Sequence, residues 1–258
     1  MNYLEEYYNN FDEDSRLLPK SRQPEFLTTM KYIEKYLAPN SRILEIGAGS
    51  GRYSRAFADM GYKVDSVELI ERNIETFRSK LKENQDINIY QGNACDLGFL
   101  ESGTYDIVLL LGPMYHLLTD EDKHKAVSEA IRVAKKNAII FVAYCNLDAC
   151  LYRNFAERTM IEKVNKGIFN AETFKENKLP NTLFLQCRKE DIDEIMSSYN
   201  IQRLHYVGVD MLTSFFRESF NDFSDEEFEL YMKYHYQICE REDLVGMSFH
   251  TLDIFKKL

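Results

Sequence analysis

The sequence of 258 residues is short of positive charge, of closely spaced cysteines and of long apolar runs. Lys and Arg number 32 against 42 Asp and Glu, and the net charge of −10 argues against nucleic acid as a partner, because phosphate contacts need clustered cations. The five cysteines include no C-x-x-C pair, which predicts reduced thiols in a cytoplasmic protein without a metal site. No apolar stretch is long enough to span a bilayer, so we expect no membrane partner.

The composition that remains suits one large α/β domain over residues 1–258, since 45% of the residues are hydrophobic and 29% are charged. Residues 41–146 alternate between short apolar runs and stretches with helical periodicity. That alternation predicts a doubly wound, mostly parallel sheet that forms the core of the domain.

The most informative stretch is residues 42–51, R-I-L-E-I-G-A-G-S-G. A short apolar run stops at three alternating glycines and is followed by helical spacing, which predicts a strand, a tight turn and a helix. Such a turn cradles a nucleotide, because the glycines let the backbone approach a ligand and the helix N-terminus leaves its N–H groups free. Arg52 stands where a dinucleotide fold has its third glycine, and the Glu45 carboxylate would repel a pyrophosphate but suit a cationic amino-acid group. The loop therefore favours S-adenosylmethionine over NAD, and the alternative is that the glycines serve the turn geometry alone.

The next two strands end in residues that suit a nucleoside. The second strand, 63–68, ends at Glu68, about 20 residues beyond the glycines, where this architecture holds ribose hydroxyls. Leu69 follows and is predicted to cover one face of the adenine. A third strand at 87–90 leads to a loop in which the Asn93 side chain and the Ala94 N–H are placed to contact the adenine edge.

A fourth strand at 105–111 is followed by Gly-Pro-Met-Tyr-His at 112–116, and a fifth strand is expected at 138–144. Ligands of open α/β sheets bind beyond the carboxyl ends of the strands, so the 112–116 loop should face the reacting centre.

Beyond residue 146 the alternation stops, and we expect further strands at 201–209 and 245–257 with helical insertions between them. Residues 1–26 form either an arm packed on the body or a flap over the cofactor, with Tyr7, Tyr8, Arg16 or Arg22 near the ligand. The insertion at 211–244 is rich in aromatic residues and is predicted to close an apolar pocket. The elements proposed as lid or arm are residues 1–26, 147–180 and 211–244, and the remaining helices are expected at 26–37, 73–83, 151–164 and 189–198.

The chain resembles the class I S-adenosylmethionine-dependent methyltransferases in four places: residues 45–51, Glu68, residues 92–94 and residues 112–116. More narrowly, the chain is similar to the bacterial type-11-like small-molecule group, in which a Gly-Pro-Leu-Tyr-His-Leu segment follows the fourth strand. Residues 26–37 and 244–250 are also similar to that group. The resemblance implies a seven-stranded Rossmann-like sheet whose last strand is antiparallel.

The resemblance also implies which residues contact the cofactor. The glycine loop would hold the methionine part, Glu68 the ribose hydroxyls, and the Leu111 carbonyl would lie near the ammonium group. The loop residues so assigned are Gly47, Ala48, Gly49 and Gly51, and the adenine residues are Asn93 and Ala94.

An oxygen or amine acceptor needs a base to remove its proton. His116 is the first candidate, with Tyr115 as a positioning partner, although His116 could instead bond nearby backbone. His250 is the second candidate, because the start of an antiparallel last strand lies at the edge where the parallel strands end.

These features predict methyl transfer from S-adenosylmethionine to a small-molecule acceptor, aligned with the S–CH₃ bond. An RNA or protein methyltransferase remains an alternative, and so does a non-catalytic subunit that binds the cofactor and supports a partner. The sequence predicts neither the acceptor nor the oligomeric state.

Overall fold

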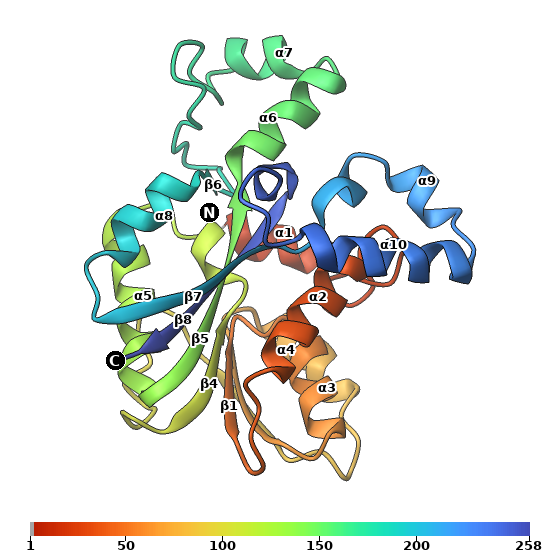
Figure 1. Ribbon diagram of the computed structural model, residues 1–258. Helices are drawn as coiled ribbons and strands as arrows, with labels where there is room; N and C mark the ends of the chain where they lie inside the picture. Colours follow the sequence, from red (N-terminus) through yellow and green to blue (C-terminus); the bar gives the residue numbers. More distant parts are fainter. Residues whose placement is uncertain (1–2) are drawn as a thin grey trace.

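The computed structural model describes residues 3–258 and shows one mixed sheet with helices on both faces (Figure 1). The strand order is β3-β2-β1-β4-β5-β8-β7, and a short strand, β6, pairs with β5 beside this path. The strands are β1 (Arg42–Ile46), β2 (Lys63–Glu68), β3 (Ile87–Gln91), β4 (Tyr105–Leu110), β5 (Ala134–Asn146), β6 (Gln186–Cys187), β7 (Ile201–Gly208) and β8 (His250–Lys257).

Strands β1 to β5 run parallel, and β8 lies antiparallel between β5 and β7. The register pairs His250, the first residue of β8, with Cys145 near the end of β5. The expected doubly wound, mostly parallel sheet with an antiparallel last strand is confirmed. The two-residue β6 was not predicted, because so short a strand has no periodicity to detect.

Two layers of helices cover the sheet, as Figure 1 shows. On one face α5 and α8 pack against the strands through residues such as Val127 and Ile192, and on the other face α2 and α3 do so through Ile33 and Phe57. The helices are α1 (Tyr3–Asn10), α2 (Gln23–Glu34), α3 (Arg52–Asp59), α4 (Glu71–Ser79), α5 (Asp120–Val133), α6 (Leu147–Ala156), α7 (Met160–Asn165), α8 (Lys189–Met196), α9 (Arg217–Asn221) and α10 (Asp225–Ile238).

Several predicted boundaries differ from the structure. The helix expected over 151–164 is two helices, α6 and α7, separated at residues 157–159. The last strand begins at His250 and not at 245, because Val245–Met247 forms a 3-10 turn. The N-terminal residues, for which no helix was predicted, contain α1, and the loop after it leads to α2, where Pro24 lies in the first helical turn.

Candidate functional site

The glycine turn joins β1 to α3 as predicted, and all three glycines have positive φ: 78° at Gly47, 56° at Gly49 and 76° at Gly51. They are not equivalent. A Cβ on Gly51 would lie 2.2 Å from the Phe77 ring, whereas a Cβ on Gly49 would meet only the flexible Glu13 side chain, at 3.2 Å. The cavity above the turn is lined by Gly47, Ala48 and Gly49 but not by Gly51. A contact of Gly51 with the cofactor stays a prediction; in this structure Gly51 caps α3 and makes room for Phe77.

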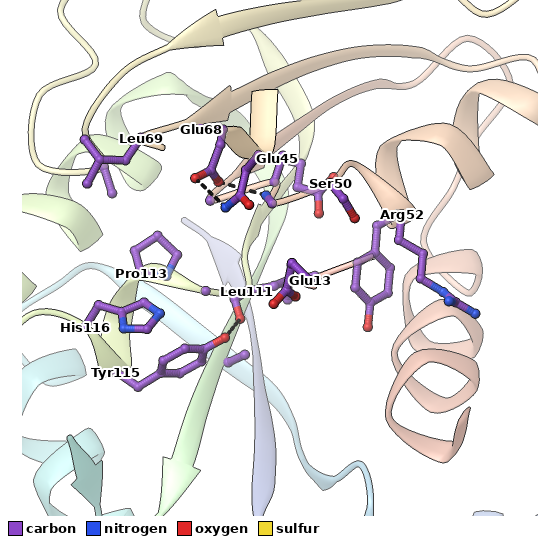
Figure 2. Close-up of a pocket in the computed structure, with 18 of the residues that line it drawn as sticks. Glu13, Glu45, Ser50, Arg52, Glu68, Leu69, Leu111, Pro113, Tyr115 and His116 are labelled. Carbon is purple, nitrogen blue, oxygen red and sulfur yellow. Dashed lines mark hydrogen bonds between the residues drawn. The ribbon is translucent and has the colours of Figure 1, made fainter. Parts of the chain in front are cut away.

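Glu68 lies at the end of β2 and ties the turn to α4 (Figure 2). Its Oε2 accepts the Gly49 N–H at 2.8 Å, while Oε1 accepts the Ile70 N–H at 2.9 Å and the Asn73 amide at 3.2 Å. These bonds fix the carboxylate beside the glycine turn, at the position where ribose hydroxyls were expected.

Glu45 is almost completely buried at the base of the same cavity. Its carboxylate accepts the Ser54 N–H at 3.0 Å and a hydrogen bond from the Ser54 hydroxyl. Burial raises the pKa of Glu45 to about 8, and the two bonds from Ser54 oppose this rise only in part. The charge of Arg55 also opposes the rise but does not cancel it, so this carboxyl holds its proton near neutral pH, and a cationic ligand group would favour its ionised form.

The predicted adenine residues line the same cavity. Leu69 is 41% exposed, which leaves its side chain accessible to a ligand, and Ala94 is buried. Asn93 does not present its carbonyl oxygen freely, because Oδ1 accepts the Cys95 N–H at 2.9 Å. Its Nδ2 group remains available, so Asn93 would act as a donor at this position.

The loop after β4 carries Tyr115 and His116 into the cavity (Figure 2). The Tyr115 hydroxyl donates to the Leu111 carbonyl at 3.2 Å, the same carbonyl that was expected to meet an ammonium group. The second lone pair of a carbonyl oxygen still allows that contact.

His116 has both ring nitrogens engaged. Nδ1 lies 2.7 Å from the Leu183 carbonyl, so Nδ1 carries the proton, and Nε2 then accepts a hydrogen bond from the Tyr8 hydroxyl at 2.9 Å. Burial lowers the pKa of His116 to about 4, although the bond to Leu183 acts in the opposite direction. At neutral pH the ring is uncharged, and Nε2 presents its lone pair toward the cavity wall formed by Tyr8.

His250 also lines the cavity, but its chemistry differs from the prediction. Its Nδ1 lies 2.8 Å from Asp210 Oδ2 and 3.5 Å from Glu25 Oε2. Burial alone would lower the pKa of His250, but the two carboxylates raise it to about 10. The two carboxylates thus favour a charged His250, which counts against its predicted role as a second base, because a protonated imidazole cannot accept a proton.

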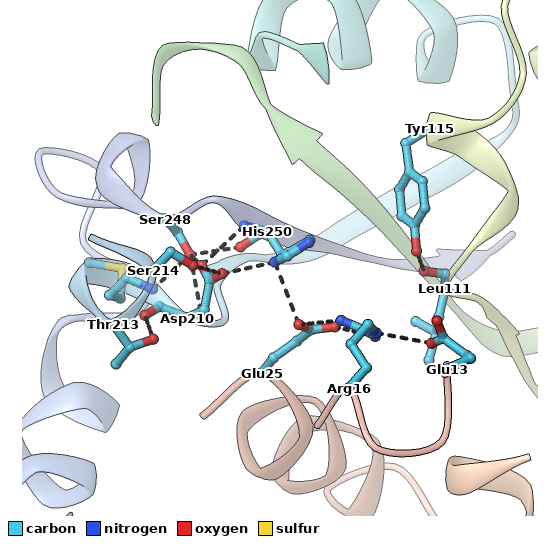
Figure 3. A network of polar contacts seen from close by, with 11 residues as sticks. Glu13, Arg16, Glu25, Leu111, Tyr115, Asp210, Thr213, Ser214, Ser248 and His250 are labelled. Carbon is cyan, nitrogen blue, oxygen red and sulfur yellow. Dashed lines mark hydrogen bonds and ion pairs between the residues drawn. The ribbon is translucent and has the colours of Figure 1, made fainter. Parts of the chain in front are cut away.

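His250 belongs to a chain of alternating charges that joins β8 to the N-terminal arm (Figure 3). Arg16 forms a bidentate pair with Glu25, both bonds at 2.9 Å, and its Nε donates to Glu13 at 2.9 Å. Four residues of this series of charges line the cavity, namely Glu13, Arg16, Glu25 and His250, and Asp210 does not. Burial acts to raise the pKa of Glu25, and Arg16 and His250 hold it below its usual value.

The arm, not the aromatic insertion, forms the outer wall of the cavity. Leu4, Tyr8 and Leu17 line it along with Glu13 and Arg16. No residue of 147–180 or 211–244 does, so the prediction that 211–244 closes the pocket is wrong. The aromatic residues of that insertion pack on one another and on α2 instead: the ring centres of Phe220 in α9 and Tyr231 in α10 are 4.6 Å apart, and His235 is hydrogen-bonded to Thr28 of α2. The sequence left open whether residues 1–26 form an arm packed on the body or a flap over the cofactor, because these residues have no strong periodicity from which their position could be predicted.

Glu13, Glu25 and Asp210 were not predicted as residues of this region. Each lies in a segment whose acids could equally face solvent, so no sequence signal marked them. In residues 3–258 no group of three His, Cys, Asp or Glu side chains could hold a metal ion, and all five cysteines are free. Within the same residues no helix has the length and apolarity needed to cross a membrane.

Comparison with known proteins agrees with this geometry. Residues 44–142, from β1 to β5, match a family model described as a methyltransferase domain. The putative methyltransferase YqeM of Bacillus subtilis is 28% identical over 112 residues, which span 43% of this chain and 44% of YqeM. The uncharacterised protein MJ1123 of Methanocaldococcus jannaschii is 24% identical over 76% of this chain and 91% of its own length.

A crystal structure of the PH0226 protein from Pyrococcus horikoshii has the same fold with a TM-score of 0.63, at 14% identity, over 98% of this chain and 99% of that one. The fold is that of solved S-adenosylmethionine-dependent methyltransferases, such as one from Methanosarcina mazei with a TM-score of 0.57, at 14% identity, over 88% of this chain and 97% of that one. The turn with space for a ligand above Gly49, the buried Glu45 carboxyl and the Glu68 carboxylate are all compatible with S-adenosylmethionine. Residues 44–142 match a methyltransferase domain, and S-adenosylmethionine is the cofactor that such a domain implies.

Proposed function

We propose that the protein methylates a small-molecule acceptor inside the cavity between the glycine turn, His116 and the N-terminal arm. The observation that supports this most is the position of the arm. Glu13, on the loop after α1, lies over Gly49, and Tyr8 of α1 is hydrogen-bonded to His116. An acceptor reaching this space must fit beneath the arm, which suits a metabolite better than a folded RNA or protein.

When bound, the cofactor supplies a methyl group that is already activated as a sulfonium. The chain has to align the acceptor, exclude water and take up a proton where the acceptor carries one. His116 is the residue placed for the proton: Nδ1–H is held by the Leu183 carbonyl, and the Nε2 lone pair takes the proton that the acceptor loses. The Tyr8 hydroxyl, which donates to Nε2, occupies the place that an acceptor O–H or N–H would take.

Tyr115 has a different role in this proposal. Its hydroxyl anchors the Leu111 carbonyl, and its ring lies against His116 at a centroid distance of 4.8 Å. Tyr115 is thus a positioning residue: it orients the Leu111 carbonyl on the cofactor side of the cavity and the ring of His116, the proposed base.

The test is conversion of S-adenosylmethionine to S-adenosylhomocysteine by the purified chain with a fractionated metabolite extract, measured by mass spectrometry. We expect turnover with a low-molecular-mass fraction and a methylated product 14 mass units above its precursor. With the acceptor in hand, His116→Gln should lower kcat about 100-fold or more with little change in S-adenosylhomocysteine affinity, which is the range for loss of a general base. Turnover only with macromolecular fractions would favour an RNA or protein methyltransferase. Binding of cofactor without turnover in any fraction would favour a non-catalytic subunit that binds the cofactor.

A further inference from the structure

The side chain of Glu13 fills the open side of Gly49, the middle glycine of the turn (Figure 2). Apart from the turn itself, the three heavy atoms nearest to the point where a Cβ of Gly49 would stand all belong to Glu13: Cγ at 3.2 Å, and Cδ and Oε1 at 3.9 Å. A ligand that packs on this side of Gly49 has to displace these atoms, because nonbonded heavy atoms stay about 3.5 Å or more apart. The Glu13 side chain and such a ligand therefore exclude one another.

The expected occupant of this place is the amino-acid part of the cofactor, which the glycine turn is predicted to hold. That part of S-adenosylmethionine carries an ammonium group and a carboxylate. The ammonium group has predicted partners in Glu45 and the Leu111 carbonyl. The carboxylate has no predicted partner so far, and it needs a cation or an N–H donor in the wall of the cavity.

Three residues that carry positive charge line the cavity in the described part of the chain: Arg16, Arg52 and His250. His250 is shared between two carboxylates, and the Arg52 guanidinium lies 4.6 Å from the centre of the Phe26 ring. Arg16 differs from both, because it already binds a carboxylate above the glycine turn: its Nε–H donates to Glu13 Oε1 at 2.9 Å. Arg16 is therefore the donor that a ligand carboxylate would find in the same place.

The position of Arg16 does not depend on Glu13. Its Nη1 and Nη2 atoms donate to the two carboxylate oxygens of Glu25, both at 2.9 Å, so that Arg16 lies between the two acids (Figure 3). If Glu13 turns away, this bidentate pair still holds the guanidinium group. The Nε–H, on a side chain that is only 21% exposed, then needs another acceptor, because a buried donor without a partner is costly.

Glu13 is the most weakly held of the acids in this wall. Its Oε1 accepts the bond from Arg16, and no donor among residues 3–258 is hydrogen-bonded to its Oε2, whereas the Glu68 carboxylate accepts three bonds. Burial raises the pKa of Glu13, and Arg16 opposes this rise. The carboxylates of Glu25 and Glu68 raise the pKa further by repulsion. A charged Glu13 is thus the group that a ligand displaces most readily.

We propose that the Glu13 side chain and the carboxylate of the cofactor compete for one place, above Gly49 and against the Nε–H of Arg16. Arg16 is the residue that binds the cofactor carboxylate, and Glu13 occupies this donor until the cofactor replaces it. One carboxylate is exchanged for another, so the ion pair of the wall is kept while the site opens. The proposal concerns the cofactor and does not depend on the acceptor.

The test measures the affinity of the full chain for two ligands by titration calorimetry. S-adenosylhomocysteine has the amino-acid part, and methylthioadenosine has the same nucleoside and sulfur without it. Glu13→Ala removes the competing carboxylate, so S-adenosylhomocysteine should bind about fivefold more tightly, the scale of one partly exposed ion pair. The affinity for methylthioadenosine should change less than twofold. The control is Glu6→Gln, which removes an exposed charge of α1 that does not line the cavity and should change neither affinity.

A second variant tests the donor. Arg16→Lys keeps a positive charge beside Glu25 but replaces the fork of N–H groups by one ammonium group, which cannot hold two carboxylates in the same geometry. It should weaken the binding of S-adenosylhomocysteine severalfold and leave that of methylthioadenosine as it is. Arg52→Gln, made for comparison, should change both affinities less than twofold.

Weaker or unchanged binding of S-adenosylhomocysteine to Glu13→Ala would overturn the competition, since a loss would make Glu13 itself a ligand of the cofactor. An equal gain for both ligands would also overturn it, because Glu13 would then limit entry to the cavity without competing for the carboxylate. A loss with Arg52→Gln and none with Arg16→Lys would assign the carboxylate to Arg52. These results leave the proposed methyl transfer untouched, because that function is tested by turnover of an acceptor.

Discussion

At the scale of single residues, burial changes the protonation of the side chains that face the cavity. Near neutral pH Glu45 is protonated, His116 is uncharged and His250 is charged. An exposed Glu would be ionised and an exposed His mostly uncharged at this pH, so Glu45 and His250 are in the opposite state to exposed side chains. None of these states is readable from the sequence, because each depends on which groups the fold places around the side chain.

Glu45 should release a proton when S-adenosylhomocysteine binds. The free carboxyl has a pKa of about 8, and the ammonium group of the ligand should lower it. The affinity should therefore rise with pH, by up to about tenfold per unit, between the lowered pKa and pH 8, and level off above it. Calorimetry in two buffers with different ionisation enthalpies measures the proton release. Glu45→Gln should bind without releasing a proton, and the same release in that variant would show that another group is responsible.

His250 should stabilise the fold in a pH-dependent way. Its pKa rises from the ordinary value of about 6.5 to about 10 on folding, so its contribution is complete below pH 6.5 and is lost as the pH rises toward 10. His250→Gln leaves the Glu25 and Asp210 carboxylates without their shared cation, which should cost about 3–5 kcal/mol at pH 6. Urea unfolding at pH 6, 8 and 9.5 should show this difference shrinking as the pH rises. A constant difference would mean that His250 is uncharged in the folded protein.

At the scale of secondary-structure elements, the sequence predicts the half of the molecule in which apolar residues recur at the spacing of a strand or a helix. Strands β1 to β5 and helices α3 and α4 appear where apolar periodicity and the glycine turn placed them. Glu68 and the 112–116 loop meet at the cavity because parallel strands end at one edge. The positions of the arm and of residues 211–244 could not be predicted, because they depend on contacts such as Arg16–Glu25 and Thr28–His235, which join residues with no shared pattern.

The arm is expected to control access to the cavity. Asp14 holds it to the body through ion pairs with Arg55, at 3.0 Å, and with Lys80. Asp14→Asn should weaken the attachment of the arm to the body by about 1 kcal/mol, the scale of partly exposed ion pairs. Dissociation of S-adenosylhomocysteine should then be several-fold faster. Stopped-flow tyrosine fluorescence and hydrogen exchange of residues 3–17 measure the two effects.

Asp59→Asn is the matched control, because Asp59 pairs with Lys82 away from the arm, at 2.8 Å. If both variants release the ligand at the wild-type rate, the arm does not have to open for exchange, and the cavity has another route to solvent.

At the scale of the whole molecule, an acidic body encloses a cavity in whose wall cations and carboxylates alternate. The net charge of −10 opposes nucleic acid, while Arg16 and His250 are each paired with carboxylates of the same wall. The arm over Gly49 limits the size of what can enter. This limit favours a small acceptor, which composition alone could not predict because composition averages over the whole chain.

The central claim is that the glycine turn and Glu68 hold S-adenosylmethionine and not a dinucleotide. Titration calorimetry with S-adenosylhomocysteine and with NAD tests it most directly, on the wild-type chain and on Glu68→Ala. We predict binding of one S-adenosylhomocysteine per chain, no heat with NAD, and an affinity loss of about 1–3 kcal/mol in Glu68→Ala, the scale of hydrogen bonds to a charged group. Binding of NAD without a signal from S-adenosylhomocysteine would contradict the account.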